Sequence, residues 1–155
     1  MMKICDIYSY NSADEHLNSL ENIYTDIKKV LNNHKLKFAK GNTRVIKKTI
    51  REEFTRNGWV DNVKIAGTHL SISFLKSRVG ICFQLGNVSR TYADILKIQY
   101  LVNSNVIDLG ILIVPHQLES KMLGQNYARY DRLVSELELF NKFITIPILL
   151  IGLSN

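Results

Sequence analysis

The sequence predicts an α/β fold, with a mixed central β-sheet flanked by α-helices, in a single domain spanning residues 1–155. Three observations predict this class. Residues 70–115 read as two strands, a helix and a third strand, the pattern of a mixed sheet with a crossover helix. Apolar runs near both ends of the chain predict further strands, and helical periodicity fills the segments between them. Polar groups in such folds gather at strand ends.

Composition and charge narrow the classes of function. The chain is 46% apolar, as in globular proteins, and has 20 Lys and Arg against 14 Asp and Glu, which gives a net charge of +6. This excess suits a nucleic-acid or acidic-membrane partner, and it equally suits simple solubility. The longest apolar run, 144–153, is far shorter than the roughly 20 residues that cross a bilayer, so no membrane span is expected.

The two cysteines favour a reducing location. Cys5 and Cys82 both lie in apolar, strand-like segments, and no secretory signal precedes them. We therefore expect a cytoplasmic protein without disulfides. Cys82 is better explained as a small buried strand residue than as a nucleophile, because no basic neighbour in sequence would stabilise its thiolate.

The first third of the chain predicts a strand and two helices. Residues 3–9 alternate as an opening strand. Ser12 and Glu15 have the spacing of a capping box, and apolar residues at steps of three and four then predict one helix of about twenty residues, ending near Leu31. A second helix is expected over 43–56, with Asn57-Gly58 ending it and Trp59 packed beneath it.

The remaining elements follow from apolar runs and breakers. Strands are predicted over 70–75 and 79–85, joined by the charged tip Lys76-Ser77-Arg78. A helix over 89–102 and a strand over 106–114, stopped by Pro115, complete the central stretch. A short helix at 116–123, an amphipathic helix at 127–140 and a strand at 144–152 close the chain.

Several short pieces, in order, resemble type II restriction endonucleases of the BglII and BstYI kind, which belong to the PD-(D/E)XK nuclease superfamily. The pieces are the run Ser73 to Gln84 followed by Gly86-Asn87, the helix ending in Gly58-Trp59, the strand with Ile107, Asp108, Gly110, Ile113 and Pro115, and a final LLIGL run at 149–153. The resemblance implies a PD-(D/E)XK fold, usually a homodimer around a short palindromic DNA duplex. It also implies carboxylates that hold Mg²⁺ against the scissile phosphate.

The active-site positions depart from the family pattern of Asp, Glu nine residues later, any residue, then Gln. Counting back from Gln84, Cys82 stands in place of Glu and Ser73 in place of Asp. A neutral hydroxyl and a soft thiol are poor ligands for Mg²⁺, so we expect no cofactor and very slow or absent cleavage. Mg²⁺ is expected only if a displaced carboxylate restores the site, and Asp94 and Glu53 are the candidates.

The predicted partner is double-stranded DNA. The resemblance places Asn87 near base edges, since an Asn amide can pair with adenine. The basic residues proposed to face phosphates are Lys47, Lys48, Arg51, Lys76, Arg78 and Arg90. For those on the second helix the alternative is an ordinary solvated face, and Asp94 is most simply an exposed helix residue near Lys97.

Three functions remain open on the sequence. The first is a DNA-binding protein with impaired phosphodiester cleavage. The second is an active Mg²⁺-dependent type II deoxyribonuclease that uses displaced acidic residues, or a disabled engineered form of one. The third is an interaction domain that keeps the sheet and no longer binds DNA.

Overall fold

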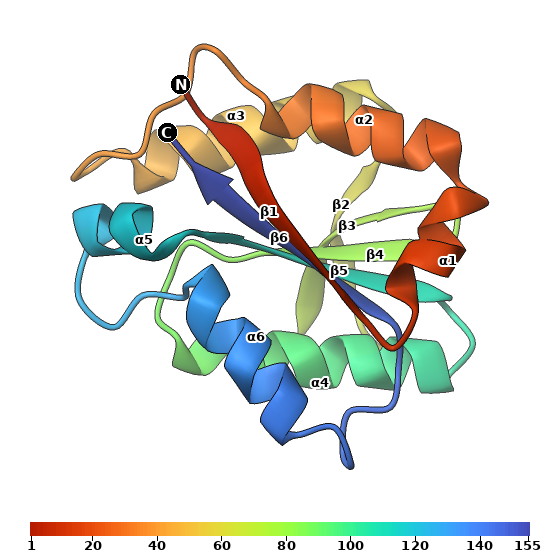
Figure 1. Cartoon of the computed structure of the whole chain (residues 1–155). Coiled ribbons are helices and arrows are strands. Elements are labelled where there is room, and N and C mark those ends of the chain that lie inside the picture. Colours follow the sequence, from red (N-terminus) through yellow and green to blue (C-terminus); the bar gives the residue numbers. More distant parts are fainter.

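A six-stranded mixed sheet forms the centre of the molecule, and helices cover both of its faces (Figure 1). The computed structural model describes residues 1–155. The strand order is β1-β6-β5-β4-β3-β2, with β4, β5 and β6 parallel and the other pairs antiparallel. The strands are β1 (Lys3–Tyr10), β2 (Val60–Lys64), β3 (Ser71–Lys76), β4 (Val79–Phe83), β5 (Leu109–Pro115) and β6 (Ile148–Ser154).

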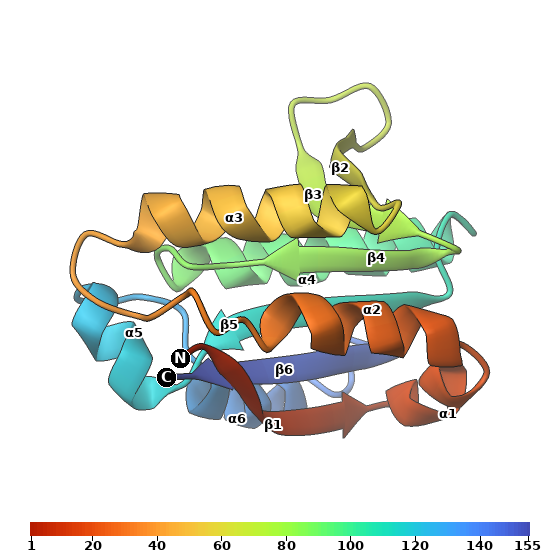
Figure 2. The same cartoon turned by 90° about the horizontal axis from the view of Figure 1, so that it is seen from above.

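The helices form two layers, one on each face of the sheet (Figure 2). Helices α1, α2 and α3 cover one face, and α4 and α6 cover the other, while α5 follows β5 directly. No helix is long and apolar enough to span a membrane. The helices are α1 (Ala13–Asn18), α2 (Glu21–Leu31), α3 (Thr43–Arg56), α4 (Ser89–Asn103), α5 (Gln117–Leu123) and α6 (Tyr130–Leu139).

The alternation of side chains along the buried strands builds both layers. In β5, Ile111 and Ile113 point into the layer under α2 and α3, whereas Leu112 and Val114 point towards α4 and α6. All residues of β5 are buried, as expected for a central parallel strand covered on both faces. The sheet is therefore a rigid base for groups at its strand ends.

The predicted α/β class, the hairpin and the crossover helix are confirmed. The turn between β3 and β4 places Ser77 and Arg78 in the left-handed region, at φ of 48° and 64°, which suits a tight hairpin turn. Trp59 is buried beneath α3, with its ring 5.3 Å from that of Phe54 in an edge-to-face contact.

The predicted capping box and the single long helix after it are wrong. Ser12 has a φ of 59° and makes no side-chain capping bond, so the start of α1 is held instead by Ser9, whose hydroxyl accepts the Asp14 amide. The helix is also interrupted at Ser19 and Leu20, which separates α1 from α2. The apolar residues keep helical spacing across Ser19 and Leu20, so the sequence pattern did not indicate that the backbone leaves the helix there.

The structure adds one strand, moves the start of one helix and shows where the last strand lies in the sheet. Strand β2 was missed because its burial alternates between exposed and half-buried and Asn62 has a φ of 48°. Helix α6 begins at Tyr130, since Tyr127 instead forms an isolated bridge with Asn87. Strand β6 lies inside the sheet, where it separates β1 from β5.

Candidate active site

A cavity of about 310 Å³ opens where β3 and β4 separate, beside the middle of α3 and the first half of α4. The backbone pairing of these two strands stops at Phe74 and Ile81. One residue further on, the Ser73 hydroxyl accepts the amide N–H of Phe83 at 2.9 Å, so a side chain replaces the missing rung of the ladder. Gln84 then pairs with β5, since its amide donates to the Ile113 carbonyl. Ser73, Phe83 and Gln84 all line the cavity.

Two helices direct charged side chains into this cavity. Lys47 and Arg51 lie one turn apart on α3, and Arg90, Asp94 and Lys97 lie on successive turns of α4. Residues three and four apart on a helix share one face, which is why each helix presents its charges together. The cavity therefore holds four cationic side chains and one carboxylate, that of Asp94.

Asp94 is at the centre of a buried polar network and is not the exposed helix residue of the simplest sequence interpretation. It is only 5% exposed. Its Oδ2 accepts a hydrogen bond from Nε2 of Gln84 at 2.9 Å, and its Oδ1 pairs with Nζ of Lys97 at 2.9 Å. Both carboxylate oxygens thus have a partner, as a buried charge requires.

Cys82 lies next to this network but inside the protein. Its side chain is 2% exposed and belongs to the apolar layer under α4. Burial, followed by the nearby charge of Asp94, raises the pKa of the Cys82 thiol well above its usual value. At neutral pH the group is a neutral thiol, so it offers neither a negative charge nor a nucleophile to the cavity.

Two of the cations have no partner within the protein. Lys47 and Arg90 form no ion pair, whereas Lys97 is paired with Asp94 and Arg51 approaches Asp61 at 3.4 Å. Partial burial, together with the neighbouring charge of Arg90, lowers the pKa of Lys47. An anion in the cavity would relieve this repulsion, which makes Lys47 and Arg90 the groups best prepared to receive one.

The donor groups present are poorly matched to Mg²⁺. This ion prefers an octahedron of oxygen ligands with at least one or two carboxylates. The cavity offers one carboxylate, whose oxygens are already engaged by Gln84 and Lys97, and a Ser73 hydroxyl that already accepts the Phe83 amide. A metal ion would have to displace Lys97 and enter among four cations.

Besides Cys82 and Asn87, four of the predicted site residues lie outside the cavity. Glu53 pairs with Arg56 on the same helix, at 2.5 Å, and Lys48 approaches Glu52 at 3.9 Å. Lys76 donates to Asp26 at 2.7 Å and to the Asn57 carbonyl at 2.6 Å. The fourth residue, Arg78, makes a two-pronged pair with Asp108 and also binds Asn105. Lys76 and Arg78 tie the hairpin to the rest of the fold.

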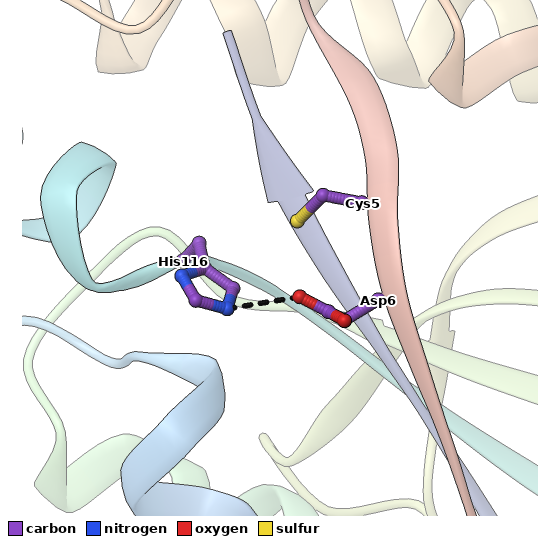
Figure 3. A group of neighbouring side chains, drawn as sticks. All are labelled: Cys5, Asp6 and His116. Carbon is purple, nitrogen blue, oxygen red and sulfur yellow. Dashed lines mark ion pairs between the residues drawn. The ribbon is translucent and has the colours of Figure 1, made fainter.

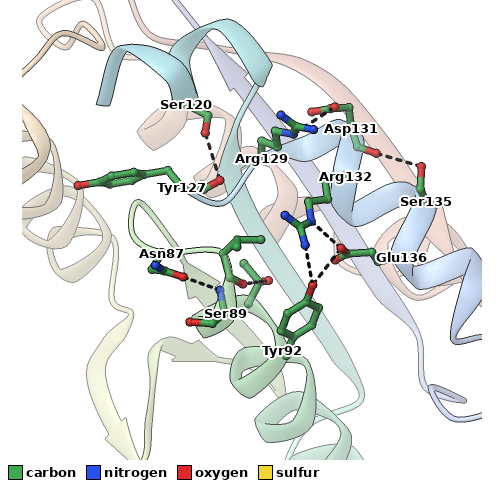
Figure 4. Close-up of polar contacts among 12 residues, drawn as sticks. Asn87, Ser89, Tyr92, Ser120, Tyr127, Arg129, Asp131, Arg132, Ser135 and Glu136 are labelled. Atoms are coloured by element: carbon green, nitrogen blue, oxygen red, sulfur yellow. Dashed lines mark hydrogen bonds and ion pairs between the residues drawn. The ribbon is translucent and has the colours of Figure 1, made fainter. Parts of the chain in front are cut away.

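Asn87 lies on an exposed loop beside the cavity, and a second loop is paired with it (Figure 4). Backbone hydrogen bonds join Val88 to Asn126 and Ala128 to Gly86, at 2.8 Å each. The Asn87 side chain accepts the amide of Ser89 at 2.9 Å, which orders the entry into α4. The second loop brings along Arg129 and Arg132, which line a neighbouring hollow and were not predicted.

Sequence reasoning missed three contributors for identifiable reasons. Lys97 was named only as the neighbour of an exposed Asp94, although its spacing of one helical turn is that of the observed ion pair. The loop at Asn126 and Tyr127 approaches Asn87 only through tertiary contacts, and no local pattern in the sequence indicates them. Asn62, on the unpredicted strand β2, also lines the cavity.

Comparisons with known proteins agree with this arrangement. The family model of the restriction endonuclease BglII/BglIII matches residues 5–153. A crystal structure of restriction endonuclease BglII complexed with a DNA 16-mer superposes with a TM-score of 0.84 at 20% identity, covering 99% of this chain and 77% of that one. Free BglII superposes with a TM-score of 0.72 at 21% identity, covering 97% and 78%. A search of curated proteins found no match.

These structural likenesses establish a restriction-endonuclease fold. The family match extends over nearly the whole chain, including β3, β4 and both helices that line the cavity. The chain therefore belongs to the restriction endonuclease BglII/BglIII family.

Proposed function

We propose that this protein binds the phosphate backbone of double-stranded DNA at the cavity between α3 and α4, and that it cleaves the bound DNA very slowly or not at all. One observation carries the proposal. The place where the family pattern has metal-binding carboxylates contains two unpaired cations, Lys47 and Arg90, and a single carboxylate that is already fully paired. The BglII structure with a similar fold contains DNA, which supports the same class of ligand here.

The binding half of the proposal rests on charge. Lys and Arg side chains that neutralise phosphates release condensed counterions, and this release supplies most sequence-independent affinity for DNA. Lys47 and Arg90 can each donate a hydrogen bond to a phosphate oxygen without first breaking an ion pair. Two carboxylates at the positions of Ser73 and Cys82 would repel a phosphate until a metal arrived, and here that repulsion is absent.

The cleavage half rests on missing ligands. In metal-dependent hydrolysis the ion polarises the phosphoryl oxygen and lowers the pKa of the attacking water. Ser73 is engaged as a hydrogen-bond acceptor and Cys82 is a buried neutral thiol, so neither supplies an anionic oxygen. With only Asp94 and the Gln84 amide remaining, the cavity favours a phosphate over a metal ion.

A working nuclease is the second candidate, and the position of Asp94 favours it. Asp94 reaches the cavity from α4 and lies beside Lys97, which gives one carboxylate and one ammonium group next to Gln84. In this alternative a migrated carboxylate holds Mg²⁺. Glu53 has no part in it, because its carboxylate pairs with Arg56 away from the cavity.

DNA binding is tested by gel shift on a mixed-sequence duplex, with EDTA or with Mg²⁺, over a range of salt concentrations. We expect a shift that is insensitive to EDTA and weakens with salt. Lys47→Ala and Arg90→Ala should each weaken binding and reduce the slope of log affinity against log salt by about one. Lys48→Ala is the matched control, since Lys48 is the next residue on α3 but lies outside the cavity.

Cleavage is measured on the same samples with Mg²⁺ or Mn²⁺. We expect no cutting above the background of a mock preparation. Cutting that Asp94→Asn abolishes would establish the migrated-carboxylate nuclease, and binding that requires Mg²⁺ would overturn the metal-independent mode. If no shift occurs even at low salt, the interaction-domain function replaces both.

Assembly and location are further parts of the proposal. We infer a homodimer, because Leu70, Leu96 and Tyr100 are exposed and line an almost wholly apolar hollow of about 330 Å³ next to the cavity. Two copies related by a two-fold axis would present two identical cavities to the two strands of a duplex. Both cysteines are free thiols in the structure, which is compatible with a reducing location. The cytoplasmic location itself remains a prediction.

A further inference from the structure

Three potential metal ligands meet at the edge of the sheet, away from the candidate active site (Figure 3). Cys5 and Asp6 come from β1, and His116 follows the end of β5 at the start of α5. The Cys5 sulfur, an Asp6 carboxylate oxygen and a His116 ring nitrogen all lie within 4.8 Å of one another. Figure 3 shows the three side chains pointing towards one another across β6.

A β-bulge in β1 produces this convergence. Neighbouring residues of a regular strand point to opposite faces, so Cys5 and Asp6 would normally diverge. The pairing of β1 with β6 skips Cys5, because Ile4 pairs with Leu153 and Asp6 with Gly152. A bulge of this kind re-aims side chains, and here both residues of the pair turn towards His116.

His116 is fixed from two sides. Its backbone amide donates to the Leu153 carbonyl at 2.7 Å, which ties the start of α5 to β6. Its ring stacks on Tyr130, with 5.5 Å between ring centroids and an interplanar angle of 23°. Nε2 consequently faces Asp6 at 3.0 Å. The imidazole is therefore preorganised with one nitrogen directed at the cluster, which lowers the entropic cost of binding a ligand there.

We propose that Cys5, Asp6 and His116 bind a zinc ion with three protein ligands and one water. Thiolate, imidazole and carboxylate form a donor set that suits Zn²⁺, whereas Mg²⁺ and Ca²⁺ disfavour sulfur. The Nε2 to Oδ2 separation of 3.0 Å is close to the roughly 3.4 Å between nitrogen and oxygen ligands of a tetrahedral zinc ion. Asp6 is 51% exposed and His116 33%, so ion and water can enter without opening the fold.

Binding exchanges a proton for the ion. The Cys5 thiol now donates to the Gly152 carbonyl at 3.3 Å. On binding, the thiol proton passes to solvent and the sulfur becomes a thiolate ligand. The proton that Nε2 of His116 donates to Asp6 also leaves that nitrogen, with the neutral ring carrying its proton on Nδ1 instead, so that Nε2 and the Asp6 carboxylate each form a bond to zinc. The ion then joins β1 to the start of α5 in place of the direct contact between Asp6 and His116. No step requires an oxidant or reductant.

The test uses the untagged full-length chain, because a polyhistidine tag would itself bind the metal. Co²⁺ replaces Zn²⁺ as the spectroscopic probe. We expect one equivalent to bind with visible ligand-field bands of a tetrahedral ion and a near-ultraviolet band from the thiolate. Added Zn²⁺ should remove both, and excess Mg²⁺ should not.

Variants assign the ligands. Cys5→Ser should abolish the thiolate band, and His116→Gln should weaken binding by at least about tenfold. His69→Gln is the matched control, since His69 is an exposed loop histidine outside the cluster. Circular dichroism verifies that each variant folds, and Cys5→Ser changes a single atom of an exposed side chain. Absence of the thiolate band in the wild type, or its persistence in Cys5→Ser, overturns the proposal.

Discussion

Asp94 carries the single negative charge of the cavity, and each of its two carboxylate oxygens has a different partner. Removing one partner of a buried pair leaves the other charge uncompensated, at a cost of roughly 3–5 kcal/mol. The ion pair with Lys97 therefore stabilises the buried Asp94 carboxylate. The same pair occupies a carboxylate oxygen that a metal ion would need. Asp94→Asn keeps the shape of the side chain and one acceptor oxygen for the hydrogen bond from Gln84, so it disturbs the site less than Asp94→Ala.

Ser73 shows how one residue changes the chemistry of the site and keeps the fold. Its hydroxyl is uncharged, so it cannot replace the Asp of the family pattern as a metal ligand. It still accepts the amide of Phe83 across the gap between β3 and β4. The position therefore retains its role in holding the two strands at the point where they separate.

The structural role of Ser73 gives a prediction on stability. Ser73→Ala leaves the Phe83 amide without its acceptor and should lower the free energy of unfolding by about 1 kcal/mol. Urea denaturation measures the change. The control is Ser71→Ala, because Ser71 lies on the same strand, is equally half-buried and has no side-chain hydrogen bond. Equal losses in both variants would mean that the Ser73 hydroxyl does not hold the strands together.

At the scale of elements, α4 is the part that joins fold and site. It carries Arg90, Asp94 and Lys97 on the side towards the cavity and packs on β5 through Ile98. The contact is close because β5 has a glycine at this point. A Cβ at Gly110 would lie 2.1 Å from Cγ2 of Ile98, a distance that no packed side chains adopt.

Because α4 and β5 lie so close together, adding one methyl group at Gly110 should strongly destabilise the fold. Gly110→Ala must push α4 away from the sheet, so we expect a loss of about 2–3 kcal/mol in unfolding free energy. DNA binding should weaken as well, because α4 carries cavity residues. Gly80→Ala is the graded comparison, since its Cβ would meet only the tips of Ile107 and Ile72, at 3.0 and 3.1 Å.

For this pair of variants, thermal and urea unfolding give the order of effects. Gly110→Ala should lose clearly more stability than Gly80→Ala. The opposite order would show that α4 adjusts freely over β5 and does not fix the position of Asp94. If Gly110→Ala is destabilised but keeps its affinity for DNA, DNA binding does not depend on the close packing of α4 on β5.

The elements also show what the sequence could and could not predict. The apolar runs of β5 and β6 are buried, apart from Ser154 at the end of β6, and were predicted because continuous apolar stretches leave few alternatives. Strand β2 is half-exposed at the sheet edge, so its pattern carries little information. The break between α1 and α2 left no signal, since apolar residues keep helical spacing across it.

The candidate site was predictable in its strands and not in its contacts. Counting along β3 and β4 placed Ser73 and Gln84 at the cavity, and the structure puts both there. The ion pairs of Lys76 with Asp26 and of Arg78 with Asp108 join residues distant in sequence, so both cations were assigned to DNA. The burial of Asp94 depends on Gln84 lying opposite α4, which is a tertiary property.

At the scale of the whole molecule, some basic residues form ion pairs within the fold and others have no acidic partner. Lys76 and Arg78 form ion pairs that stabilise the fold. Lys47 and Arg90 line the cavity and form no ion pair. In the proposed mode of binding, the net charge of +6 would attract DNA from a distance, and the free cations would fix where the DNA binds. One cavity can contact one strand of a duplex, so a second copy is needed to contact both.

The apolar hollow beside the cavity is the surface on which we propose that a second copy binds. Leu96 on α4 is 64% exposed and Tyr100, one turn later, is 48% exposed, which is unusual for large apolar side chains that line one hollow. Lys97 lines both the hollow and the cavity. A partner seated on the hollow would therefore lie next to bound DNA.

Dimerisation through this hollow predicts the behaviour of one substitution. The wild-type chain should have twice its 17.8 kDa mass in light scattering, and Leu96→Glu should be monomeric, because a charge would be buried without a partner. Leu118→Glu is the matched control: Leu118 is 66% exposed, lies on α5 and does not line the hollow. We expect it to remain dimeric.

Leu96→Glu should also weaken DNA binding at equal chain concentration, since a monomer has only one cavity. A monomeric wild type at all concentrations, or loss of the dimer in Leu118→Glu alone, would place the interface elsewhere.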